Sequence, residues 1–215
     1  MEIRTIPART HGRYLIRKPA GSGPWPVLMG FHGYRENAEM HMSALESLAG
    51  SDPWLLVAVQ GLHRFYTKGG DVVASWMTKE DRELAIADNV AYVGAVIEAV
   101  RSEFSTRDPL VFVGFSQGTA MAFRAAGHFA AGMLIVVGAD VPPDVLSGTA
   151  VPLPPVLYGR GRNDDLYTAD AHAKDVAALE QLCGNVQTVI YDGGHELSPE
   201  FLSAASQRVA KLLVQ

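Results

Sequence analysis

The sequence lacks the features that mark disulfide-stapled, secreted and membrane-spanning proteins. Its 215 residues include a single cysteine, so no internal disulfide can form. The longest apolar runs, such as residues 54–59, have the length of a strand and are too short to cross a bilayer. The N-terminus has no apolar stretch of the kind that a signal peptide needs. We therefore expect a soluble, cytoplasmic protein without a membrane span.

The sequence also lacks a large excess of charge of either sign. The 18 Lys and Arg residues stand against 23 Asp and Glu residues, which gives a net charge of −5. This balance argues against a nucleic-acid partner, because such binding depends on many phosphate contacts. Hydrophobic residues make up 48% of the chain, which is enough for a sizeable core. The length predicts one domain over residues 1–215.

Strand-like and helix-like segments alternate along the chain. Short apolar runs bounded by Gly, Pro or Asp predict strands, and segments with helical spacing predict helices between most of them. This alternation is typical of an α/β fold with a mostly parallel central sheet and helices on both faces. The predicted strands are 13–16, 27–31, 55–59, 110–115, 133–137, 156–158 and 186–191, and the predicted helices are 38–48, 80–100, 117–126, 169–182 and 199–214.

Three connecting segments have distinctive compositions. The turn-rich P-A-G-S-G-P-W-P at 19–26 joins the first two predicted strands and predicts an antiparallel hairpin. The Pro-rich segment 142–155 predicts a loop rather than a domain linker, because neither flank holds an independent set of elements. Residues 61–78 show no clear periodicity and predict the longest loop.

The strongest chemical signal is G-F-S-Q-G at 114–118, which lies between a predicted strand and an Ala-rich helix. Gly114 and Gly118 remove Cβ atoms where a tight turn from strand to helix crowds the backbone. Ser116 at the apex would stand at the N-terminal end of a helix, where developing negative charge is favoured. The bare pattern also arises by chance, but this context predicts a nucleophile elbow.

A serine hydroxyl is a weak nucleophile, so Ser116 needs a base. The chain has seven histidines, and His172 and His195 are the two that follow both Ser116 and a suitable acid. His172 lies inside a predicted helix, and we interpret it as a solvated helical residue. His195 directly follows the last predicted strand, so it can reach the sheet edge where Ser116 should stand.

The acid that orients the histidine should lie after the preceding strand. Asp164 and Asp165 both occupy that loop. Asp140 and Asp144 are reserve candidates, because some triads take the acid from the earlier loop. The residues alone leave this choice open.

An oxyanion hole needs backbone N–H groups directed at the carbonyl oxygen as it becomes charged. One donor should be the N–H of Gln117, the residue after the nucleophile. The loop F-H-G-Y-R-E-N at 31–37 follows a central strand and suits the second donor. We predict that this donor is the N–H of Tyr34.

These four pieces, in this order, resemble the α/β-hydrolase fold, and most closely its phospholipase/carboxylesterase branch. The resemblance runs from the H-G loop to the final helix, and G-F-S-Q-G is more specific to the branch than G-x-S-x-G. The segment 161–168 is similar to the family's G-x-x-D-x-x-[VY] acid loop, which places the family's acid on Asp164. The family's serine, histidine and oxyanion donors fall on Ser116, His195, Tyr34 and Gln117.

One position departs from the family pattern. Many relatives carry Gly after H-G-x, where this chain has Arg35. A side chain there can strain the turn, crowd the acyl pocket or supply a cation for an acidic substrate. Arg35 therefore joins Phe65, Trp76 and Met77 of the long loop as candidates for the substrate pocket, with simple packing within that loop as the alternative.

The resemblance implies a serine hydrolase that cleaves carboxylic esters of small to medium acyl or alcohol groups through a Ser-His-Asp triad and an acyl-enzyme. It implies no metal, no organic cofactor and no large lid domain. An acyl thioesterase or a dienelactone-type hydrolase is the alternative within this class. A non-catalytic binding protein with the same fold is the alternative outside it. The expected partner is a small-molecule ester, and the resemblance also suggests a homodimer.

Overall fold

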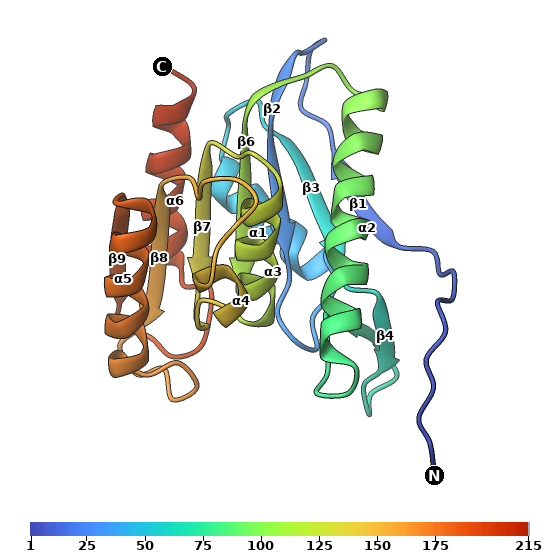
Figure 1. Cartoon of the computed structure of the whole chain (residues 1–215). Helices are drawn as coiled ribbons and strands as arrows, with labels where there is room; N and C mark the ends of the chain where they lie inside the picture. Colours follow the sequence, from blue (N-terminus) through green and yellow to red (C-terminus); the bar gives the residue numbers. More distant parts are fainter. Residues whose placement is uncertain (215) are drawn as a thin grey trace.

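The computed structural model describes residues 1–214, in which a seven-stranded sheet lies between two layers of helices (Figure 1). The mostly parallel α/β fold predicted from the sequence is confirmed. The strands are β1 (Arg13–Arg17), β2 (Trp25–Phe31), β3 (Leu55–Gln60), β4 (His63–Tyr66), β5 (Val72–Ser75), β6 (Thr106–Phe115), β7 (Met133–Val137), β8 (Val156–Gly161) and β9 (Val186–Tyr191). The helices are α1 (Ala38–Ala49), α2 (Arg82–Glu103), α3 (Gln117–His128), α4 (Pro143–Leu146), α5 (Ala169–Cys183) and α6 (Pro199–Leu212).

Alternate side chains of the central strands belong to two separate cores. On β6, Leu110 and Phe112 belong to the core that includes residues of α2, α3 and α5, whereas Val111 and Val113 belong to the core that includes residues of α1 and α6. Because both faces of this strand are covered, its sequence is a continuous apolar run rather than an alternating one. Burial of apolar area at roughly 25 cal/mol per Å² makes these two cores the main source of stability.

The predicted hairpin between the first two strands is wrong. The sheet order is β1-β3-β2-β6-β7-β8-β9, so β2 lies between β3 and β6. Because β2 pairs in parallel with both neighbours, neither of its edges is open to β1. The chain does reverse direction after β1, but β1 pairs antiparallel with β3. Turn composition signals a reversal and does not show which strand becomes the partner.

Residues 61–78, predicted as a loop, contain the two-stranded hairpin of β4 and β5 (Figure 1). Its register pairs His63 with Ser75 and Tyr66 with Val72. Each strand has four residues, which is too short for a clear alternating pattern. The segment 142–155, also predicted as a loop, begins with the short helix α4 and otherwise has no helix or strand.

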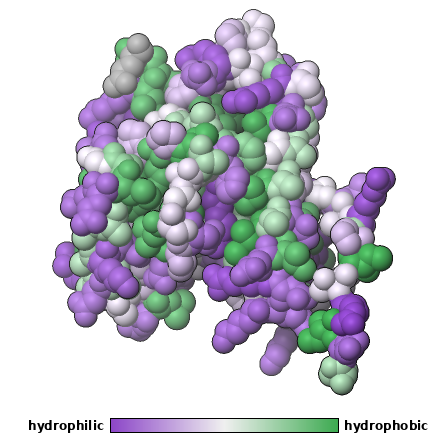
Figure 2. Space-filling view, in the orientation of Figure 1, coloured by the Kyte–Doolittle hydropathy of each residue, from purple (hydrophilic) through white to green (hydrophobic). Residues whose placement is uncertain are grey.

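The N-terminal segment before β1 has no helix or strand and extends away from the body of the molecule (Figure 1). Figure 2 shows this segment projecting at the lower right. Ile3 and Ile6 belong to the segment and are exposed. Among residues 1–214, none of the helices combines the length and the apolar character that a bilayer crossing requires.

His41 of α1 is a buried titratable group that links stability to pH. Its ring packs against Gly30 of β2, where a Cβ atom would lie 2.4 Å from the imidazole Cδ2. Burial lowers the pKa of His41 to about 3, so its ring is neutral in the folded protein. In the unfolded chain the same ring has a pKa of about 6.5. As the pH falls below about 6.5, the unfolded state binds a proton that the folded state does not, and the free energy of unfolding decreases.

We predict that His41→Phe makes the protein less sensitive to acid, because phenylalanine keeps an aromatic ring against Gly30 and cannot titrate. Urea unfolding at pH 7 and pH 5 should show a stability loss about 1–2 kcal/mol smaller in the variant. His32, whose pKa burial lowers to about 4, is present in both proteins and cancels in the comparison. An equal loss in the two proteins would contradict this role for His41.

Candidate active site

Ser116 occupies the sharp turn from β6 to α3. Its φ is 51° and its ψ is −122°, a combination that an L-residue rarely adopts. Such a conformation costs about 1–3 kcal/mol and persists only when the surrounding structure holds it. The N–H of Ser116 donates to the carbonyl oxygen of Val137 on β7 at 2.9 Å. The turn is therefore tied to the neighbouring strand at the C-terminal edge of the parallel sheet.

Two glycines allow α3 to approach the sheet at this turn. A Cβ atom on Gly118 would lie 2.0 Å from the carbonyl oxygen of Phe31 on β2. A Cβ atom on Gly114 would lie 2.6 Å from the carbonyl oxygen of Gly118. Both separations are too short for any side chain. Only glycine fits at these two positions, for the steric reason that the motif predicted.

The structure brings Ser116, His195 and Asp164 together at this edge. The Nε2 atom of His195 lies 2.8 Å from the Oγ atom of Ser116, and its Nδ1 atom lies 2.9 Å from Oδ2 of Asp164. The tautomer that satisfies both contacts donates from Nδ1 to the carboxylate and accepts at Nε2 from the hydroxyl. The His195 side chain is 20% exposed and the Asp164 side chain is 0% exposed. The carboxylate is thus shielded from water while the imidazole remains accessible.

The Asp164 carboxylate is held by its own loop. Its Oδ1 atom accepts hydrogen bonds from the N–H groups of Leu166 and Tyr167, both at 2.9 Å. Asp165 is exposed and forms no hydrogen bond or ion pair with His195. Of the two acids that follow β8, Asp164 is therefore the one that the structure pairs with the histidine.

The reserve acids lie elsewhere. Asp140 is exposed, and both carboxylate oxygens of Asp144 pair with the guanidinium of Arg124 at 2.8 Å. Arg124 is itself buried, so this ion pair joins α3 to α4. Neither Asp140 nor Asp144 contacts His195 in the part of the chain that is described.

The prediction that His172 is solvated is wrong. His172 is 6% exposed, and its ring packs edge-on against Tyr158 at 5.0 Å and Tyr167 at 5.8 Å. Burial lowers its pKa, so this histidine is neutral within an aromatic cluster. Arg160 on β8 is also buried, at 7% exposed, and donates from Nε to the carbonyl oxygen of Tyr167 at 2.8 Å. The prediction that His172 lies in a helix is confirmed. The sequence alone does not show which face of α5 meets the sheet.

The loop after β2 is fixed by two titratable groups, the buried His32 and the half-buried Glu36. The ring nitrogens of His32 lie 2.6 Å from the carbonyl oxygen of Gly33 and 3.0 Å from the N–H of Gly61, which donates to Nε2. Burial lowers the pKa of His32 to about 4, so the ring stays neutral and donates from Nδ1. The N–H of Gly33 donates to the carboxylate of Glu36 at 2.7 Å, and burial raises the pKa of that carboxyl. These contacts shape the turn that contains Tyr34.

The backbone N–H groups of Tyr34 and Gln117 donate no hydrogen bond within residues 1–214. Gln117 is the first residue of α3, where an N–H has no partner inside the helix. Tyr34 and Gln117 follow β2 and β6, which are neighbours in the sheet. The two predicted oxyanion donors therefore remain available to an external acceptor.

The side chain of Gln117 connects the turn to the segment after β5. Its Oε1 atom accepts from the N–H of Trp76 at 2.8 Å and from the hydroxyl of Ser75 at 3.1 Å. Its Nε2 atom donates to the carbonyl oxygen of Met77 at 2.9 Å. The glutamine of G-F-S-Q-G thus fixes one side of the site. Sequence reasoning missed this role, because it depends on a contact between segments 40 residues or more apart.

A cavity of about 370 Å³ adjoins Ser116. Its lining residues come from three parts of the chain, which are the segment 77–82, the turn and helix around Ala120 of α3, and the segment 139–143. Met77, one of the pocket candidates from the sequence, lines this cavity. The lining residues are Met77, Thr78, Lys79, Arg82, Ser116, Gln117, Ala120, Ala139, Asp140, Val141, Pro142 and Pro143.

The structure does not bring the other pocket candidates to this cavity. Trp76 is fully buried and donates from its indole nitrogen to the carbonyl oxygen of His32 at 2.8 Å. Phe65 stacks on the exposed ring of Tyr34 with 5.7 Å between the ring centroids. Arg35 is exposed on the loop after β2 and is not among the residues that line the cavity.

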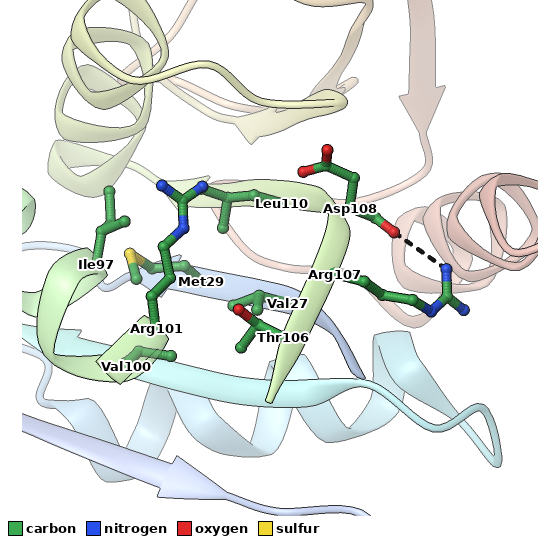
Figure 3. Close-up of a pocket in the computed structure, with 9 residues that line it drawn as sticks. All are labelled: Val27, Met29, Ile97, Val100, Arg101, Thr106, Arg107, Asp108 and Leu110. Carbon is green, nitrogen blue, oxygen red and sulfur yellow. Dashed lines mark hydrogen bonds between the residues drawn. The ribbon is translucent and has the colours of Figure 1, made fainter. Parts of the chain in front are cut away.

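A second cavity, of about 200 Å³, lies near the opposite ends of β2 and β6 (Figure 3). It contains no paired nucleophile and base, and among residues 1–214 no three His, Cys, Asp or Glu side chains are grouped to hold a metal ion. The cavity beside Ser116 is therefore the candidate active site. The second cavity is lined by the aliphatic residues Val27, Met29, Ile97, Val100 and Leu110, together with Arg101, Thr106, Arg107 and Asp108.

Comparisons with known proteins agree with this architecture. A family model described as phospholipase/carboxylesterase matches residues 27–213. Comparison with curated protein sequences gives no significant match.

Solved structures share the fold at low sequence identity. A carboxylesterase from Bacillus cereus is 18% identical, with a TM-score of 0.75 over 94% of each chain. Acyl-protein thioesterase 2 from Zea mays is 18% identical, with a TM-score of 0.72 over 94% of this chain and 100% of that one. Esterase PE8 is 22% identical, with a TM-score of 0.72 over 94% of this chain and 98% of that one.

Arg35 shows the backbone strain that its place in the loop suggested. Its φ is 63°, in the left-handed region that favours glycine. Its N–H donates to the carbonyl oxygen of Ala74 at 3.1 Å, which keeps the backbone in that conformation. For a residue with a Cβ atom the left-handed conformation costs roughly 1–2 kcal/mol.

We predict that Arg35→Gly raises the free energy of unfolding by about 0.5–1 kcal/mol, because relief of strain exceeds the entropy that glycine adds to the unfolded chain. Denaturant unfolding of purified protein measures this change. The control is Lys68→Gly in the exposed turn between β4 and β5, where φ is not positive and the substitution should destabilise. Destabilisation of similar size in both variants would contradict the strain at Arg35.

Proposed function

This chain belongs to the phospholipase/carboxylesterase family, whose fold and hydrolase character it shares. We propose that it is a serine hydrolase that cleaves carboxylic esters of small to medium acyl or alcohol groups. The observation that carries this proposal is the pair of hydrogen bonds that joins Ser116 to His195 and His195 to Asp164. Ser116 lines a cavity of about 370 Å³.

The first half of the reaction forms an acyl-enzyme. The Oγ atom of Ser116 attacks the acyl carbon while Nε2 of His195 takes the hydroxyl proton. The carbonyl oxygen becomes an oxyanion and accepts hydrogen bonds from the N–H groups of Tyr34 and Gln117. When the intermediate collapses, the bond from carbon to the leaving oxygen breaks, and Nε2 returns the proton to the departing alcohol.

The second half releases the acid by the reverse sequence. Water replaces the alcohol, His195 takes a proton from it, and the hydroxide attacks the acyl carbon. Collapse breaks the bond to Ser116 Oγ, which receives the proton from His195. Throughout, Asp164 keeps the proton on Nδ1 and stabilises the imidazolium that forms in each half. Its two backbone hydrogen bonds leave Oδ2 free for this contact.

The cavity supports substrates of modest size. Apolar atoms of Met77, Ala120, Val141 and Pro142 provide a surface for a short acyl chain. Thr78, Lys79, Arg82 and Asp140 give the same cavity a polar portion. A thioester fits the same mechanism, so oxygen esters and thioesters of matched chain length should be compared to assign the subclass.

We predict that Ser116→Ala abolishes covalent labelling by a fluorophosphonate probe and lowers kcat for p-nitrophenyl esters by about 10⁴-fold or more. Alanine removes the nucleophilic oxygen and leaves the fold intact. Ser102→Ala, on the exposed face of α2, is the matched control and should keep full activity. A folded wild-type protein that neither reacts with the probe nor hydrolyses any ester would instead indicate a binding protein.

We predict that Asp164→Asn lowers kcat by about 10³–10⁴-fold, because an amide can donate to Nδ1 and so favour the wrong histidine tautomer. Asp165→Asn makes the same chemical change on the adjacent exposed residue and should alter kcat less than twofold. Steady-state kinetics with p-nitrophenyl acetate measure both values. Equal activity in the two variants would remove Asp164 from the proposed mechanism.

A further inference from the structure

Asp175 of α5 is a buried carboxylate that the proposed mechanism does not use. It is 7% exposed, and within residues 1–214 no Lys, Arg or His side chain forms an ion pair with it. Its Oδ2 atom accepts hydrogen bonds from the hydroxyl of Tyr167 at 2.8 Å and from the N–H of Val141 at 3.2 Å, and it lies 3.3 Å from the hydroxyl oxygen of Tyr158. A buried charge without a cation is costly, so these hydrogen bonds must offset its loss of hydration.

One side of this network holds a wall of the cavity beside Ser116. Val141 lines that cavity and donates its N–H to Asp175. Ala139 also lines the cavity, and its carbonyl oxygen accepts from the hydroxyl of Tyr158 at 2.5 Å. Residues 139–141 belong to no helix or strand, so these two hydrogen bonds replace the regular backbone pairing that would otherwise fix them.

The other side of the network holds the acid loop. Tyr167 donates its hydroxyl to Asp175 and its backbone N–H to Oδ1 of Asp164. Its ring stacks on that of Tyr158, with 5.8 Å between the centroids and 22° between the planes. Tyr167 therefore connects Asp175 to Asp164, through its hydroxyl on one side and its backbone N–H on the other, and Asp164 in turn contacts His195.

The two phenols act as donors in this network. Burial raises the pKa of Tyr158 well above its ordinary value and also raises the pKa of Tyr167. Their hydroxyl groups therefore stay protonated. Both rings are buried, so the hydroxyls are shielded from bulk solvent.

We propose that Asp175 is a positioning residue that holds, through a single carboxylate oxygen, both the 139–141 wall of the cavity and the loop of Asp164. It thereby links the size of the acyl group that the site accepts to the alignment of His195. This inference rests on the proposed function, and it adds a determinant of acyl-chain preference that touches neither substrate nor reacting atoms.

Asp175→Asn tests the proposal, because it keeps the side-chain volume and removes the charge that attracts the hydroxyl of Tyr167 and the N–H of Val141. We expect kcat/KM for p-nitrophenyl acetate to fall about tenfold, since coupled neighbours of this kind change barriers by that order. We also expect the ratio of octanoate to acetate hydrolysis to rise about fivefold or more, because a less restrained 139–141 wall excludes long chains less well. Glu180→Gln makes the same chemical change on the exposed face of α5 and should leave both values unchanged.

Leu179→Ala separates positioning from simple stability. Leu179 is fully buried on the same helix, and its truncation should lower the unfolding temperature without removing any hydrogen bond of the network. We expect its ratio of octanoate to acetate hydrolysis to equal that of the wild type. If Asp175→Asn behaves as Leu179→Ala does, with a lower unfolding temperature and an unchanged ratio, the proposal is wrong.

Tyr167→Phe provides an independent variant in case Asp175→Asn does not fold. It removes the hydroxyl on Asp175 and keeps the backbone N–H on Asp164. It should shift the acyl-chain ratio in the same direction, and an unchanged ratio would overturn the proposal. A wild-type protein that hydrolyses no ester would refute the proposed function, whereas an active wild type with unaltered ratios in both variants would refute this inference alone.

Discussion

The strained turn at Ser116 is the constraint on which the rest of the site depends. Its left-handed backbone persists because α3 lies directly against β2, with Gly118 beside the carbonyl oxygen of Phe31 and the N–H of Ser116 bonded to β7. A helix placed further from the sheet would move the hydroxyl away from His195 and the N–H of Gln117 away from the loop of Tyr34. The energy that holds this strain comes from the two apolar cores that fix the helices on the sheet.

Buried polar side chains then join the loops that the parallel strands bring to one edge. Gln117 ties the turn to the segment after β5, His32 ties the loop after β2 to Gly61, and Asp175 ties the loops after β7 and β8. Each of these side chains hydrogen-bonds to a segment that is distant in the sequence. The position of one loop therefore depends on the position of the loop bonded to it. Buried polar networks of this kind rigidify a site when their partners are satisfied, and they make each member sensitive to substitution. The resulting order explains how a site built from loops can hold a hydroxyl, an imidazole and a carboxylate in line.

Fold class and the main elements could be predicted because periodicity reports local structure and burial. Ser116 and His195 could be found because a motif and the order of residues along the chain carry that information. Asp164 could be preferred over Asp165 through family resemblance alone, since the residues themselves left the choice open. The partner of β1 and the burial of His172 and Arg160 could not be predicted, because they depend on which strand edges and helix faces meet. The β4–β5 hairpin escaped detection because its strands are short, and the role of Gln117 escaped because it spans distant segments.

The account depends most on Ser116 being the atom that attacks an acyl carbon within reach of two backbone donors. A crystal structure of the protein after reaction with an alkyl phosphonate ester tests this directly, because the tetrahedral adduct mimics the intermediate of acyl transfer. The account predicts a covalent bond from phosphorus to Ser116 Oγ, with a phosphonyl oxygen about 2.7–3.1 Å from the backbone nitrogens of Tyr34 and Gln117. An adduct on another residue, or an adduct on Ser116 whose oxygen faces neither nitrogen, would contradict it.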